Sequence, residues 1–151
     1  MKYFLCFLLV SLISISHAFA QNDVVKVAID GTNYYYSTDM SKVPAEILGL
    51  YKYKDNGILQ EPIVELNPTG EGQFQPHMVP AIPIKFWIEV DEKGTVQKLE
   101  GANGNYQVIL VIQYTGGTNG NYPAGGFSRM GVVVAKDQGQ AIIYGERFKA
   151  L

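Results

Sequence analysis

The sequence is poor in the side chains that bind transition metals and form disulfides. Its 151 residues include one cysteine, Cys6, and two histidines, His17 and His77. Zinc, copper and iron–sulfur sites draw mostly on clustered cysteine and histidine ligands. The composition therefore argues against such sites, and one cysteine cannot form an internal disulfide. We expect no cofactor and no metal.

The first twenty residues have the pattern of a secretory signal peptide. Lys2 precedes an apolar run over residues 3–15, and the small residues Ala18 and Ala20 stand just before Gln21. Cys6 begins the apolar run and is not beside the cleavage point, so we do not expect a lipid anchor. The predicted mature protein is secreted, periplasmic or extracellular, and contains no cysteine.

A transmembrane anchor is the alternative interpretation of this segment. Spanning a bilayer takes about 20 apolar residues, and here serines and His17 interrupt the run. We therefore expect no membrane span after cleavage.

Charge and motifs argue against several further classes of function. Loss of Lys2 lowers the basic residues from 12 to 11 against 14 acidic ones, a net charge of −3. With no basic cluster, nucleic acid is not an expected partner. The glycine-rich loop at residues 116–126 lacks the lysine and helix of a phosphate-binding loop. No calcium-loop motif is present, and no serine lies in a G-x-S-x-G elbow.

A hydrolase with paired carboxylates would require two glutamates to meet in a cleft. The candidates are Glu65, Glu89, Glu100 and Glu146. We expect the protein not to be an enzyme.

The remaining pattern predicts an all-β protein. Residues 24–29 and 34–36 flank Asp30-Gly31, an N-terminal hairpin. One short helix is expected over residues 41–48, and about eight strands follow Gly49, separated by short turns. The predicted strands cover residues 50–54, 61–67, 72–77, 84–90, 95–101, 106–115, 127–136 and 141–149.

Short turns between successive strands favour an antiparallel meander that closes into a barrel, with a Greek-key sandwich as the alternative. The expected organisation is a signal peptide (1–20), a hairpin extension (21–40) and a barrel domain (41–151). Two strands, at residues 108–112 and 132–134, are apolar on both faces. Their outer faces need a cover, which could be the hairpin, a second layer or a second subunit in a homodimer.

A few residues resemble those of the lipocalin-like (calycin) barrels. In that family a short helical turn closes one barrel end and leads into a Gly-x-Trp, and a basic residue of the last strand packs across the tryptophan. Gly49-Leu50-Tyr51 and Arg147 occupy the matching places here. The resemblance implies a barrel closed by Gly49, Tyr51 and Arg147, with Arg147 over the Tyr51 ring. It also implies that a small ligand is bound.

Four aromatic residues are candidates for ligand binding. Tyr34 and Tyr36 share one face of the hairpin, and Trp87 lies on the polar face of its strand. Tyr122 lies in the long glycine-rich loop, where a barrel mouth is expected. For each residue, simple packing or linkage is the alternative to binding. His77 has no partner that the sequence reveals.

Two functions remain open from the sequence alone. The first is a binding protein that holds a small apolar or amphipathic ligand in or at the mouth of the barrel. The second is an interaction module with a filled core and an apolar outer patch that meets another protein. A lumen of a few hundred Å³ would distinguish the first from the second.

Overall fold

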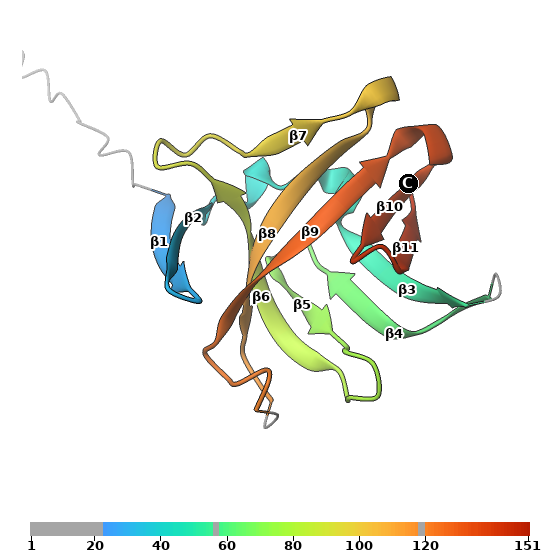
Figure 1. The fold of residues 1–151 in the computed structure, drawn as a ribbon, viewed down its shortest axis with the longest axis horizontal. Helices are drawn as coiled ribbons and strands as arrows, with labels where there is room; N and C mark the ends of the chain where they lie inside the picture. Colours follow the sequence, from blue (N-terminus) through green and yellow to red (C-terminus); the bar gives the residue numbers. More distant parts are fainter. Residues whose placement is uncertain (1–22, 56–57, 118–119) are drawn as a thin grey trace, which may run out of the picture.

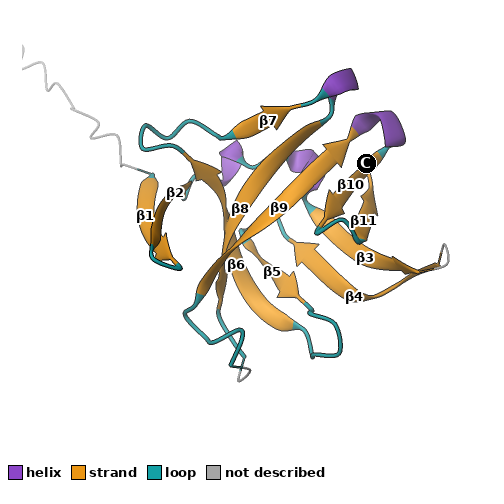
Figure 2. Ribbon diagram, viewed as in Figure 1, coloured by secondary structure: helices purple, strands orange, loops and turns teal. Residues whose placement is uncertain are grey.

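In the computed structural model, the described residues (23–55, 58–117 and 120–151) form a β-barrel with short 3₁₀ turns and no α-helix (Figure 2). The predicted signal peptide lies outside these residues. The strands are β1 (Val24–Ile29), β2 (Thr32–Ser37), β3 (Gly49–Asp55), β4 (Ile58–Leu66), β5 (Glu71–Phe74), β6 (Ile82–Val90), β7 (Lys98–Glu100), β8 (Tyr106–Tyr114), β9 (Phe127–Ala135), β10 (Gln140–Ile143) and β11 (Arg147–Ala150). The 3₁₀ turns are η1 (Met40–Lys42), η2 (Ala45–Ile47), η3 (Ala102–Gly104) and η4 (Lys136–Gln138). None of the helical segments within this described part could cross a membrane.

Eight of the strands close into an antiparallel barrel (Figure 1). Their order around the wall is β3, β4, β5, β6, β8, β9, β10 and β11, and each is hydrogen-bonded to the next. The wall closes where β11 pairs with β3, with Arg147 opposite Tyr53 and Phe148 opposite Lys52. The predicted meander and its closure of last strand on first are thus confirmed.

The number of barrel strands is as predicted, but their identity differs. The strand expected over residues 141–149 is two strands, β10 and β11, joined by a turn in which Tyr144 (φ 52°) and Gly145 (φ 72°) are left-handed. The strand expected over residues 95–101 is only the three-residue β7. It pairs with the first part of β8 and lies outside the eight-stranded wall.

The predicted short helix is two separate 3₁₀ turns, η1 and η2. Proline has no N–H and disfavours helical backbone in the residue before it. Val43, which precedes Pro44, is accordingly extended (φ −75°, ψ 122°). The N-cap of η1 is Asp39, whose Oδ1 accepts hydrogen bonds from the backbone N–H (2.9 Å) and hydroxyl (2.7 Å) of Ser41.

The N-terminal hairpin forms as predicted and covers part of the barrel wall. Asp30 (φ 49°) and Gly31 (φ 79°) make its turn, and β2 pairs with the end of β6. Between hairpin and wall lies a second apolar cluster in which Val111, on the outer face of β8, is fully buried. The hairpin therefore supplies the cover that the two-faced sequence of β8 required.

The main core fills the barrel interior from the end beside η1 and η2 as far as Phe74 and Tyr114. Alternate residues of β6 and β8 point inward, among them Phe86, Ile88 and Leu110, and none of these three is exposed. Val43 and Ile47, from the segment before β3, join the same cluster. That segment thus closes this end of the barrel, as expected from the sequence.

The contact between Tyr36 and Trp87 anchors the hairpin. The two rings stack with centroids 4.6 Å apart and an interplanar angle of 26°. Aromatic pairs of this kind contribute about 0.5–1.5 kcal/mol beyond buried area. In a double-mutant cycle of Tyr36→Ala and Trp87→Ala, we expect a coupling in that range in the free energy of unfolding, measured by urea denaturation followed by circular dichroism.

The control cycle pairs Tyr36→Ala with Leu99→Ala, since Leu99 is 69% exposed on β7. We expect these two changes to be additive. Additivity of the Tyr36 and Trp87 changes would show that the stacking does not hold the hairpin.

Candidate functional site

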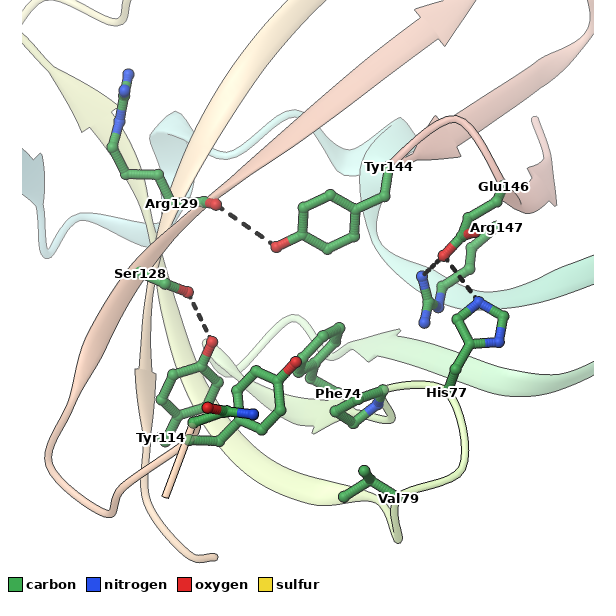
Figure 3. A pocket seen from close by; sticks show the side chains of 12 residues that line it. Phe74, His77, Val79, Tyr114, Ser128, Arg129, Tyr144, Glu146 and Arg147 are labelled. Atoms are coloured by element: carbon green, nitrogen blue, oxygen red, sulfur yellow. Dashed lines mark hydrogen bonds and ion pairs between the residues drawn. The ribbon is translucent and has the colours of Figure 1, made fainter. Parts of the chain in front are cut away.

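The end of the barrel opposite η1 and η2 is hollow. Three connections surround it: residues 75–81 between β5 and β6, residues 115–126 between β8 and β9 (118–119 lie outside the described part), and residues 144–146 between β10 and β11. They border a cavity of about 530 Å³ that opens widely to solvent (Figure 3). This volume falls within the range of roughly 300–1,000 Å³ that is usual for small-molecule sites. We call it the mouth cavity.

Four aromatic rings line the mouth cavity: Phe74, Tyr114, Tyr122 and Tyr144. Ring centroids are 5.3 Å apart for Tyr114 and Tyr122, 5.6 Å for Phe74 and Tyr122, and 6.1 Å for Phe74 and Tyr144. Phe74 and Tyr114 are the last inward-facing residues of β5 and β8, which is why they gather where the packed core ends. The rings meet at interplanar angles of 57–72° and form an aromatic wall.

The tyrosine hydroxyls provide neutral polar groups in this wall. The Tyr114 hydroxyl lies 2.8 Å from Ser128 Oγ, and that of Tyr144 points across the cavity toward the carbonyl of Arg129 (Figure 3). Burial raises the pKa of Tyr114, and it raises the pKa of Tyr144 to about 12. Both phenols therefore stay protonated at neutral pH and can donate hydrogen bonds.

Arg147 is a buried cation beside these rings. Its residue is 2% exposed, and its guanidinium carbon lies 5.7 Å from the Phe74 centroid and 6.0 Å from that of Tyr144. Nη2 donates to the Gln75 carbonyl (2.9 Å) and Nη1 donates to Glu146. Nε is buried without a hydrogen-bond partner among the described residues.

Glu146 and His77 stand at the rim of the mouth cavity. Glu146 Oε1 accepts from Arg147 and lies 3.2 Å from His77 Nε2. The His77 side chain is half exposed and its ring meets that of Tyr53 edge-on, at 5.1 Å between centroids. The histidine that the sequence left without a partner thus has two.

Of the four predicted ligand residues, only Tyr122 reaches the mouth cavity. Tyr34, Tyr36 and Trp87 come together elsewhere, in the apolar cluster between hairpin and barrel wall. Arg129, whose side chain points away from the cavity, lies 4.2 Å from the Tyr34 centroid and forms a two-bond ion pair with Glu89. For these three aromatic residues the packing alternative describes the contacts they make.

The predicted closure residues lie at the joint of β3 and β11, with one correction. Gly49 (φ 125°) begins β3, where a Cβ would approach Lys149 Cε to 2.8 Å. The Tyr51 ring is fully buried and its hydroxyl donates to the Ile47 carbonyl at 2.7 Å. The prediction that Arg147 packs over Tyr51 is wrong, because Tyr51 turns toward the closed end while Arg147 lies among the rings of the open end.

Sequence reasoning missed Phe74, Tyr114, Tyr144 and the Arg147–Glu146–His77 group. The first two were inside predicted strands, and strand alternation places both on the inner face. Only one of the four glutamates considered for paired-carboxylate chemistry, Glu146, lines the mouth cavity. Within the described residues, no three histidine, cysteine, aspartate or glutamate side chains form a group that could hold a metal ion.

Comparison with known proteins adds no relative: no family model, no curated protein and no solved structure matches the chain.

The Tyr51 hydrogen bond ties the closing segment to the first barrel strand. Tyr51→Phe removes the donor and leaves the Ile47 carbonyl without it in a buried place. We expect a loss of about 1–3 kcal/mol in the free energy of unfolding, measured by urea denaturation. Tyr53→Phe is the matched control on the same strand and should change stability little. Equal effects of the two changes would refute the role given to the Tyr51 hydroxyl.

Proposed function

We propose that this chain is a secreted, non-enzymatic binding protein that holds a small amphipathic molecule in the mouth cavity. The observation that carries the proposal is the open cavity of about 530 Å³ at the end of the barrel opposite η1 and η2, lined by aromatic rings that border the packed core.

The lining supports an amphipathic rather than a purely apolar ligand. Aromatic rings offer flat faces for an apolar body, and the cavity also presents hydroxyl, carboxylate and guanidinium groups. The lining is about as polar as it is apolar, and polar groups placed beside apolar faces can fix a ligand's orientation. No bond making or breaking is part of the proposal.

We further propose that the barrel is of the lipocalin-like (calycin) type. The closed eight-stranded meander, the short turns before β3 and the Gly49-Leu50-Tyr51 start of that strand support this assignment. Fold likeness gives an expectation of ligand binding and says nothing of which ligand. The proposal of secretion depends on the signal-peptide pattern of residues 1–20. The absence of cysteine after them fits a periplasmic as well as an extracellular location.

A protein-interaction module is the alternative. An apolar groove of about 290 Å³ crosses the outer face of β8, β9 and β10, next to Val133 and Ile142. It lies away from the cluster that the hairpin covers. A partner protein would bind this outer groove and leave the mouth cavity unused.

Native mass spectrometry of residues 21–151, purified from the organism that makes the protein, tests the proposal. We expect a co-purifying molecule of defined mass that Tyr122→Ala weakens or abolishes, because Tyr122 contacts Phe74 and Tyr114 in the cavity wall. Tyr34→Ala is the control, since Tyr34 lies outside the barrel and should leave the bound mass unchanged. A protein without bound ligand, or one captured with a protein partner, would favour the interaction module.

A further inference from the structure

Arg147 is the one arginine or lysine that is buried among the described residues. A guanidinium has five N–H donors, and the described contacts use one on Nη1 and one on Nη2. Burying a cation is costly unless it is paired and hydrogen-bonded. Arg147 therefore combines a fixed positive charge with spare donor capacity at the edge of a cavity.

The anion that balances Arg147 is held much less firmly than Arg147 itself. The Glu146 side chain is 36% exposed, whereas that of Arg147 is 3% exposed. Glu146 lies in the turn between β10 and β11, at the rim, and His77 offers its carboxylate a second partner 3.2 Å away. Glu146 can thus rotate toward solvent and keep a partner, while the guanidinium cannot leave the barrel.

From this asymmetry we propose that the mouth cavity selects ligands carrying a carboxylate, which pairs with Arg147 in place of Glu146. Glu146 then acts as an internal counter-anion that occupies Arg147 in the empty protein. The inference rests on the proposed function and names its ligand class: a flat or aromatic body against the ring wall, with one anionic group directed at Arg147. Arginine suits this task because its planar fork matches a carboxylate.

The polar atoms around the cavity agree with an anionic group. The hydroxyls of Tyr114 and Tyr144 are uncharged and pair with Ser128 and with the Arg129 carbonyl, and the rings of Phe74 and Tyr144 flank the guanidinium. A cationic ligand would meet the buried Arg147 charge, which cannot move away. It would find its only carboxylate partner of the lining, Glu146, at the outer edge.

Three probes of the same shape separate ligand charge from cavity binding: 2-naphthoic acid, the neutral 2-naphthamide and the cationic 2-naphthylmethylamine. Binding to residues 21–151 is measured by isothermal titration calorimetry at pH 7. We expect naphthoate to bind at least tenfold more tightly than naphthamide, and the amine to bind most weakly.

Variants then test the counter-anion. Glu146→Gln removes the competing charge while keeping a hydrogen-bond acceptor, so naphthoate should bind about tenfold more tightly and naphthamide should change less than twofold. Glu65→Gln removes the same charge from β4, away from the mouth cavity, and should change neither affinity. Arg147→Met should abolish the preference for naphthoate, and if that variant fails to fold, the Glu146→Gln result decides.

The possible outcomes distinguish a failure of carboxylate selection from a failure of ligand binding in the mouth cavity. Equal binding of naphthoate and naphthamide, unaffected by Glu146→Gln, would overturn carboxylate selection and leave the binding cavity standing. Weaker naphthoate binding in Glu146→Gln, or a preference for the amine, would also overturn it. Failure of all three probes to bind would count against both proposals.

Discussion

The hydrogen bonds between β11 and β3 determine the rest of this architecture. Two residue pairs form the ladder at this seam, Arg147 with Tyr53 and Phe148 with Lys52, and the Lys54 N–H also donates to the Glu146 carbonyl at 3.3 Å. Their register turns Arg147 inward and Phe148 outward, since neighbours along a strand face opposite sides. It also brings the turn at residues 144–146 to the open end, so that Glu146 stands beside His77. Without this register the cavity would have neither its cation nor that cation's counter-anion.

The same eight strands supply both the packed core and the lining of the mouth cavity. Branched and aromatic side chains of β6, β8 and β9 fill the closed end, where Ile47 and Val43 complete the packing. At the open end Phe74, Tyr114, Ser128 and Arg147 line the mouth cavity, and Phe74 and Tyr114 are also the last members of the core.

Much of the fold could be predicted from the sequence, because short turns and strand periodicity are local signals. Asp30-Gly31 correctly predicts the turn of the hairpin. The alternation of polar and apolar residues around Trp87 correctly predicts which residues of β6 face inward. The turn between β10 and β11 was not predicted because it places Tyr144 in left-handed backbone. That conformation is uncommon for tyrosine, so the residue type gives no sign of it. The length of β7 was overestimated. All three of its residues are exposed, so no alternation of buried and exposed positions marks its ends.

The candidate site was less predictable, since it joins residues from several elements that are far apart in sequence. Tyr122 was predicted from its position in the glycine-rich loop, but Phe74 and Tyr114 come together only because β5 and β8 both pair with β6. Arg147 was correctly expected in the closing strand. Its ring partner was not, because strand pairing fixes which side a residue faces and does not fix which inward neighbour a long side chain reaches.

The seam between β3 and β11 also has a consequence for how the molecule is assembled. It joins strands at the two ends of the barrel sequence, so this contact has nearly the largest loop-closure entropy the domain can offer. If the chain leaves a membrane channel with its N-terminus first, β3 emerges early and its partner β11 emerges last. Until then β3 has an unpaired edge, and such edges invite association with other chains. The barrel therefore stays open to association with other chains until β11 pairs with β3.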